Sequence, residues 1–244
     1  MSAVDVTSPF SAFAVGRRAG RELAEMVQKL GTRLTDHRGL IELPALMVLF
    51  DDIGGLPFYF AGEGSSLQAR LMISALGRPD VDEELDATAE LTVDDGDYGI
   101  TSVRITGRGG RPLVAGTARN VRVGRALVDA NTEHLSIGEP VAADEAPAVA
   151  RPSTELSGRE VIDRIIAGEL PIGPISELLG IGLAFDGDAL VVTAPAEEWM
   201  GNIMGTMHGG MIAAIVAQGI SFGAQAATRP GGDYQLSDLA IAFL

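Results

Sequence analysis

The chain has 244 residues, of which 46% are hydrophobic, and its formal net charge is -15. This length and apolar content suffice for one large folded domain or two small ones. The acidic balance disfavours nucleic acid as a partner, because its phosphates would be repelled. The absence of cysteine excludes disulfides, thiolate metal sites and a cysteine nucleophile, and it makes the cytoplasm the expected compartment.

The first predicted element is an amphipathic helix within residues 15–34, in a leading segment that covers residues 1–36. Its polar face mixes Glu with Lys and Arg, which favours a helix packed on a sheet or a partner over one that lies on a membrane. The helical spacing is carried by four apolar residues: Leu23, Met26, Val27 and Leu30.

Residues 37–126 are predicted to form a first folded unit, in which a buried helix is followed by an antiparallel meander. The apolar segment 40–60 places Pro44 at a first helical position and is expected to end near Gly54 and Gly55. Strands are expected where apolar residues alternate between turn sequences, at 67–76, 84–93, 98–106 and 112–123.

A linker rich in Ala, Pro and Glu is expected at residues 127–156, before a second unit at residues 157–244. Ser157 and Glu160 form a capping-box pattern that predicts a helix to about residue 167. The following elements are a hairpin at 181–194, a helix that begins at Gly209 and a last strand at 235–244. The helix is apolar enough to raise the question of a membrane span, but its Gln and Gly residues favour burial in a protein core.

The second unit is expected to be incomplete. No equivalent of the meander at 84–123 follows the last strand, so its apolar residues Leu239, Ile241 and Phe243 would form an unpaired edge. We therefore expect this chain to be a fragment of a longer one.

The strongest functional signal is the glycine-rich segment from Gly201 to Gly210, which leads into the apolar helix. Glycines around His208 allow a backbone to approach a ligand closely. A helix that begins at Gly209 directs unpaired N–H groups at a developing negative charge, which suits acyl transfer.

The two units are related by an internal register that supports a divergent tandem duplication. When the segment at Leu40 is aligned with the segment at Thr206, Glu42 lies opposite His208 and Asp51 lies opposite Ala217. The histidine and the acid are therefore in different units.

These residues resemble the PaaI-like group of hotdog-fold acyl-CoA thioesterases. The pattern of that group is Asn, then Gly, then His-Gly-Gly at the start of the central helix, with Asp nine positions after the His. Asn202, Gly205 and the triplet from His208 to Gly210 match it, whereas the Asp position is Ala217. In the first unit the Asp position, Asp51, matches, and the His-Gly-Gly position reads Glu42-Leu43-Pro44.

The resemblance covers roughly residues 37–126 and 170–244, and it implies an α+β fold made of tandem hotdog units. Each unit has a long central helix wrapped by an antiparallel sheet. The units pair as a pseudo-dimer with a continuous sheet, and the second is incomplete at its C-terminus. It also implies a homo-oligomer, a dimer of such tandem chains, with acyl-CoA as its partner and no nucleic acid, membrane, metal or cofactor.

In the family, each site takes Asn and His-Gly-Gly from one unit and Asp from the other. The resemblance therefore implies one composite site, with Asn202, His208 and Gly209 from the second unit and Asp51 from the first, and an inactive second site. The N–H of Gly209 would stabilise the oxyanion, and Asn202 would position water. His208 would shape the turn or polarise the carbonyl, and Asp51 would act as general base or as nucleophile.

The remaining substrate-binding candidates surround the same turn. Asp52, next to Asp51, is the competing acid. The residues expected to contact the acyl group or its carbonyl are Gly205, Met207, Gly210 and Met211.

Thioester hydrolysis of aryl or medium-chain acyl-CoA is the function that these residues favour. One alternative is a hotdog hydratase or dehydratase that acts on enoyl or hydroxyacyl thioesters. Relatives of that kind place Asp and His within a few residues on one turn, a spacing absent around His208. The other alternative, a non-catalytic acyl-CoA-binding protein, is motivated by the degenerate first unit.

Overall fold

The computed structural model describes residues 6–17, 24–124, 138–141 and 146–243. The predicted linker at 127–156 therefore lies partly outside the described residues. The helices and strands, in chain order, are α1 (Pro9–Phe13), β1 (Val15–Gly16), β2 (Glu25–Lys29), α2 (Met47–Ala61), β3 (Ser65–Ala75), β4 (Glu84–Asp94), β5 (Tyr98–Thr106), β6 (Pro112–Val123), α3 (Gly158–Ile166), α4 (Pro174–Leu178), β7 (Gly182–Asp186), β8 (Ala189–Thr193), α5 (Gly209–Ala226) and β9 (Asp238–Ala242).

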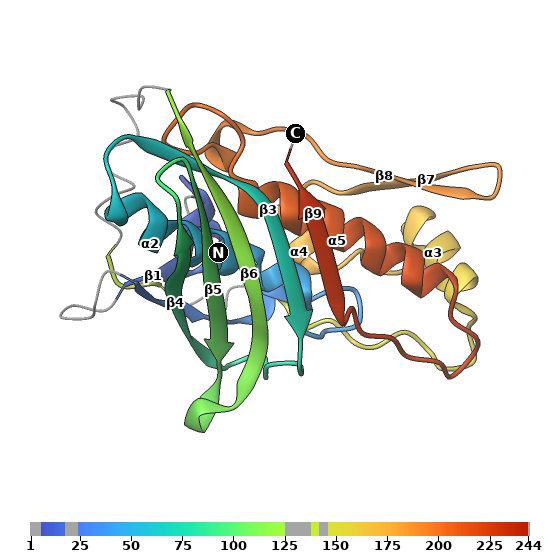
Figure 1. The fold of residues 1–244 in the computed structure, drawn as a ribbon. Coiled ribbons are helices and arrows are strands. Elements are labelled where there is room, and N and C mark those ends of the chain that lie inside the picture. The colour runs from blue at the N-terminus through green and yellow to red at the C-terminus, as the bar shows by residue number, and fades with distance from the viewer. Residues whose placement is uncertain (1–5, 18–23, 125–137, 142–145, 244) are drawn as a thin grey trace.

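A long helix wrapped by an antiparallel sheet forms the centre of the first unit, as the sequence predicted. The sheet has the order β1-β2-β4-β5-β6-β3-β9, and α2 lies along one of its faces (Figure 1). Along β5, exposed and buried residues alternate, so that Val103 and Ile105 point at the helix. Phe50 and Ile53 of α2 are fully buried. The predicted α+β class is confirmed.

The second unit joins the same sheet through β9. This strand pairs antiparallel with β3, with Leu71 opposite Ile241 and Ile73 opposite Leu239. Helix α5 packs beside α2 so closely that a Cβ on Gly210 would lie 2.7 Å from the Cα of Val48. A continuous sheet thus joins the two predicted units, whereas the tandem hotdog arrangement and the incompleteness of the second unit stay predictions.

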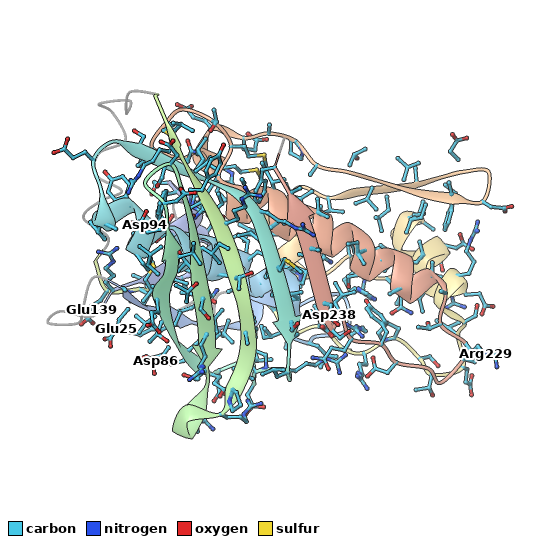
Figure 2. The ribbon with its side chains drawn as sticks, viewed as in Figure 1. Glu25, Asp86, Asp94, Glu139, Arg229 and Asp238 are labelled. Carbon is cyan, nitrogen blue, oxygen red and sulfur yellow. The ribbon has the colours of Figure 1, made fainter. Side chains whose placement is uncertain are left out.

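The other predicted elements of the second unit are present. Ser157 and Glu160 form the capping box of α3, with each side chain bonded to the other residue's backbone N–H. Strands β7 and β8 form the expected hairpin as a separate two-stranded sheet. Charged side chains lie at the rim of the molecule, among them Arg229 beyond the end of α5 and Asp238 at the start of β9 (Figure 2).

The predicted amphipathic helix at residues 15–34 is wrong for the part that the structure describes. Residues 25–29 form β2, which pairs with β4 over five residues, and residues 18–23 lie outside the described part. Gln28 is fully buried and its Nε2 donates to the carbonyl oxygens of Phe13 and Ala45, at 2.9 and 2.8 Å. Sheet pairing and this buried bond override the helical periodicity.

The central helix α2 is longer than predicted, because Gly54 and Gly55 do not end it. A Cβ on Gly54 would lie 2.9 Å from the Cβ of Ala118. The absence of a side chain therefore lets the sheet pack closely on α2, and the glycine does not end the helix. A 3₁₀ turn at Leu43–Leu46 precedes the helix.

By length and composition alone, two helical segments of the described residues qualify as membrane-span candidates, Leu43–Ala61 and Gly209–Ala226. Two-thirds of the first is buried inside the protein, which is typical of a core helix.

Candidate functional site

The predicted acid and the predicted histidine meet where α5 begins against α2. Oδ2 of Asp51 lies 3.2 Å from Nδ1 of His208, although the two residues are far apart in sequence. Asp51 is the fifth residue of α2, and His208 is the N-cap of α5. The residues are 3% and 7% exposed. The packing of the two helices therefore brings together groups from the two units.

The two side chains accept hydrogen bonds from one backbone N–H. The N–H of Gly210 donates to both atoms, to Asp51 Oδ2 at 2.7 Å and to His208 Nδ1 at 3.0 Å. If either the carboxyl or the imidazole carries a proton, the 3.2 Å separation of Oδ2 and Nδ1 is short enough for a hydrogen bond between them. The pair is thus able to pass a proton from one group to the other.

Burial changes the acidity of Asp51. Desolvation raises its pKa to about 7, the Gly210 hydrogen bond opposes this rise, and the nearby Asp52 adds to it. Oδ1 of the same carboxyl is buried and has no hydrogen-bond partner within the described part of the chain. A carboxylate with one unsolvated oxygen is a stronger base and nucleophile than a hydrated one.

Gly209 faces this carboxyl directly. A Cβ at this position would lie 2.9 Å from both carboxyl oxygens of Asp51, so a side chain would displace the acid. The N–H of Gly209 makes no hydrogen bond to any residue that the structure describes. It lies at the first helical position, where the N-terminal end of the helix dipole favours negative charge.

Gly210 holds the acid, and its predicted contact with substrate stays a prediction. Its N–H is bonded to Asp51, and the absence of a side chain lets α5 contact the backbone of Met47 and Val48. Met211, another predicted substrate contact, is fully buried in the core, whereas Met207 is half-buried beside the turn.

Asn202 holds the shape of the glycine-rich turn. Its Oδ1 accepts from the N–H groups of Met204 and Thr206, at 2.9 and 3.1 Å, and its Nδ2 donates to the Thr206 hydroxyl at 2.9 Å. Gly205 has φ of +72°, a conformation that favours glycine. The described bonds of Asn202 are thus those of a turn residue, and its contact with water or substrate stays a prediction.

Two residues near the site were not predicted from the sequence. The ring of Phe10, in α1, meets the His208 ring edge-on at a centroid distance of 5.7 Å. Nε2 of Gln68, in β3, donates to the backbone oxygen of Asp51 at 2.7 Å. Ser8 caps α1 and Pro9 follows it, so the sequence carried a capping pattern that predicts the helix containing Phe10. No sequence pattern pointed to Gln68.

Asp52, the competing acid, lies on another side of α2. Burial raises its pKa to about 6, and the charge of Arg17 opposes this rise. Asp51, not Asp52, is the residue that contacts the turn at His208.

The position equivalent to His208 in the first unit is Glu42, the residue that precedes the 3₁₀ turn of α2. Its Oε1 lies 2.7 Å from Nη2 of Arg38 and 2.6 Å from Nε of Arg78. Burial raises the Glu42 pKa, and the two arginines oppose the rise. Ala217, the position aligned with Asp51, is fully buried and supplies no acid.

The ion network around Glu42 ties the two units together. Arg38 is bonded to Asp36 and Asp233, each within 2.8 Å, and its guanidinium stacks 3.8 Å from the Tyr234 ring centroid. The positive charge of Arg38 is balanced by the carboxylates around it. The ion network around Glu42 therefore acts as a structural clamp.

Comparisons with known proteins give structural similarities only. No protein-family model matches the sequence, and no curated protein matches it. Among solved structures, the PaaI protein of the E. coli phenylacetic acid degradation operon is similar over 41% of this chain and 72% of its own, with 14% identity and a TM-score of 0.39.

Two further solved structures contain coenzyme A. A hypothetical thioesterase of Streptococcus pneumoniae TIGR4 is similar over 41% of this chain and 77% of its own, with 23% identity and a TM-score of 0.37. The BH2602 protein of Bacillus halodurans is similar over 44% and 71%, with 14% identity and a TM-score of 0.40.

Proposed function

We propose that this protein hydrolyses the thioester bond of aryl or medium-chain acyl-CoA at one composite site, with Asp51 from the first unit and His208 and Gly209 from the second. The observation that carries the proposal is the contact between the Asp51 carboxyl and the His208 turn. The buried acid lies beside the N–H of Gly209, which donates to no residue that the structure describes, and acyl transfer requires such a pair of groups.

The chemistry follows from these atoms. The carbonyl oxygen of the thioester would accept the N–H of Gly209, which stabilises the negative charge that develops there. As nucleophile, Asp51 attacks the carbonyl carbon, coenzyme A leaves as its thiolate, and water then hydrolyses the mixed anhydride and restores the carboxylate. As general base, Asp51 instead takes a proton from the water that attacks. In the nucleophilic route Asp51 reacts as the carboxylate, whereas in the general-base route it gains a proton, which Nδ1 of His208, 3.2 Å away, would accept.

The proposal is tested by the release of free thiol from a panel of aryl- and acyl-CoA substrates. Asp51→Asn keeps an oxygen that accepts the Gly210 N–H but removes the base, so we expect a loss of at least about 1000-fold in kcat/KM. Asp52→Asn is the control, because it makes the same change at the adjacent, half-buried acid, and it should retain activity within about threefold. Equal losses in the two variants would contradict the assignment of Asp51.

A rapid burst of thiol equal to the enzyme concentration would identify Asp51 as the nucleophile, because it reports an acyl-enzyme intermediate.

A second candidate reaction is supported by the same contact. A carboxyl and an imidazole that share a proton can also add or remove protons during hydration of an enoyl thioester. Loss of enoyl-CoA absorbance without thiol release, abolished by Asp51→Asn, would favour this reaction over hydrolysis.

A further inference from the structure

The outer face of the main sheet carries large apolar and aromatic side chains that no described helix covers. Helix α2 packs on the opposite face, and Figure 1 looks onto the outer face with α2 behind the sheet. The exposed fractions on this face are 49% for Met72, 51% for Val93, 47% for Tyr98 and 37% for Ile100. Single exposed apolar residues are common on proteins, whereas neighbouring ones mark an interaction surface.

The register of the strands places these side chains next to one another. Ile100 in β5 lies opposite Val93 in β4 and opposite Arg119 in β6, so the three form one row across the sheet. Arg119 in turn lies opposite Arg70 in β3. Tyr98 points to the same side as Ile100, and the Arg119 guanidinium lies 5.2 Å from the centroid of its ring. We call these residues the outer patch: Arg70, Val93, Tyr98, Ile100 and Arg119.

The two arginines of the outer patch are like charges on directly opposite positions. Both are exposed, and neither side chain forms an ion pair or a hydrogen bond with any residue in the described ranges. Side chains that face each other on antiparallel strands have Cβ atoms about 5 Å apart, where like charges destabilise the sheet. A carboxylate between Arg70 and Arg119 would relieve this repulsion and accept hydrogen bonds from both. The pair is therefore suited to bind an anionic group.

The acidic residues Glu90 and Asp238 share the outer face but lie away from the arginine pair. Glu90 is in β4, so that β5 separates it from Arg119. Asp238, labelled in Figure 2 at the start of β9, accepts from the hydroxyl of Ser74, four residues after Arg70. The outer patch is thus a basic and apolar surface on a chain whose net charge is -15. An acidic partner would be attracted to this patch and repelled by most of the remaining surface.

We propose that the outer patch binds an amphipathic helix of an acidic partner protein. Carboxylates of the helix would bind Arg70 and Arg119 in the bidentate geometry that guanidinium groups favour, and its apolar stripe would pack on Val93, Tyr98 and Ile100. A helix suits this surface, because the face of a sheet is commonly buried by the apolar stripe of a helix. Tyr and Arg are also among the residue types that contribute most to binding at protein interfaces. This proposal is independent of the catalytic one.

A second copy of this chain is a poorer occupant than an acidic partner. Face-to-face packing of two outer patches would bring both arginine pairs into one buried interface. Removing guanidinium groups from water without a carboxylate for each costs free energy. The acidic helix supplies these carboxylates.

The probe is a fluorescein-labelled synthetic peptide of about 20 residues, a length at which isolated helices form. It carries Glu along one stripe and Leu and Phe along the adjoining stripe. We expect fluorescence anisotropy to show binding to the full chain in about 50 mM NaCl and an affinity at least about fivefold lower in about 500 mM NaCl, because salt screens exposed charges. A matched peptide with Lys in place of Glu should not bind.

A variant of the arginine pair separates binding from folding. Arg70→Glu sets opposite charges on the facing positions, so the Tm should be kept or raised. The Kd of the acidic peptide should nevertheless rise at least about tenfold, because one charged hydrogen-bond donor is replaced by a repelling carboxylate. Arg108→Glu makes the same charge change in the turn after β5, where the side chain is 69% exposed. This control should change the Kd by less than about twofold, because the exposed charge is screened from the patch.

The proposal is overturned if the acidic peptide does not bind, if the Lys peptide binds equally well, or if Arg70→Glu and Arg108→Glu weaken binding alike. It is also overturned if sedimentation shows self-association of the full chain that Ile100→Ser abolishes. Binding to phosphatidylglycerol vesicles that Arg70→Glu abolishes would overturn it in favour of a lipid surface.

Discussion

Glu42 and His208 occupy equivalent positions before the two central helices, yet their surroundings differ. Glu42 is bonded to Arg38 and Arg78, so its charge is neutralised. His208 faces Asp51, a buried carboxyl. Burial raises the pKa of both acids, but two arginines oppose the rise at Glu42, whereas at Asp51 it is the Gly210 N–H that opposes it. The neutralised position therefore fastens the segment before α2 to the segment before β9, whereas the other position holds a buried acid without a bonded arginine or lysine among the described residues.

The largest expected effect on stability comes from removing Arg38, which compensates the charges of Glu42 and Asp36. Arg38→Ala leaves Glu42 and Asp36 buried with too little positive charge, which should lower the free energy of unfolding by about 3–5 kcal/mol. Urea unfolding monitored by circular dichroism measures this. Arg151→Ala removes an exposed partner of Asp233 and should cost less than about 1 kcal/mol. Similar losses of unfolding free energy in the two variants would contradict the distinction between the buried Arg38 clamp and the exposed Arg151–Asp233 pair.

The proposed site at Asp51 and His208 is disturbed most directly by a substitution at Gly209. Gly209→Ala places a methyl group against the Asp51 carboxyl, so kcat for thiol release should fall by about 100-fold or more. Gly223→Ala makes the same change on the same helix, where no heavy atom lies within 4 Å of the new methyl. That control should retain full activity, and a matching loss there would show a general effect on α5.

Removing the buried acid should stabilise the protein at alkaline pH. The folded-state pKa of Asp51 is raised, so the folded state binds its proton more tightly than the unfolded state, and this contribution to stability is lost as the pH rises through about 7. Asp51→Asn should therefore raise the free energy of unfolding at pH 8 by on the order of 2 kcal/mol. The difference should shrink towards pH 4. An Asn variant less stable than the wild type at pH 8 would contradict the raised pKa.

The smallest effect is expected at Phe10, whose ring meets the His208 ring edge-on. Phe10→Ala should reduce kcat/KM by about fivefold, since an edge-on aromatic pair contributes about 1 kcal/mol. Phe60→Ala, at an exposed aromatic residue that pairs with Tyr59, should leave kcat/KM unchanged. No loss in the Phe10 variant would show that the ring does not hold the imidazole in place.

The sequence was sufficient where local patterns agree with the fold. Alternating apolar residues between glycine-containing turns located β4, β5 and β6 to within about one residue, because a half-buried sheet imposes that period. The capping box at Ser157 located α3 for a similar local reason. The meeting of Asp51 and His208 followed from the internal register and the resemblance, not from local patterns.

Features that depend on distant contacts were missed or wrong. Residues 25–29 have helical spacing but form a strand, because β4 and the bonds of Gln28 determine their conformation. The helix was predicted to end near Gly54, but this glycine lies within α2, where the absence of a side chain lets Ala118 pack closely. The clamp at Arg38 joins residues more than 190 positions apart, a pairing with no signature in either local segment.

The central claim is that Asp51 and His208 act as one site across the two units, and a double-mutant cycle in kcat/KM tests it most directly. We predict that Asp51→Asn with His208→Ala together lose no more activity than the worse single variant, because both remove the same proton-sharing pair. Losses that multiply would contradict the composite site, because they would show that the two residues act independently.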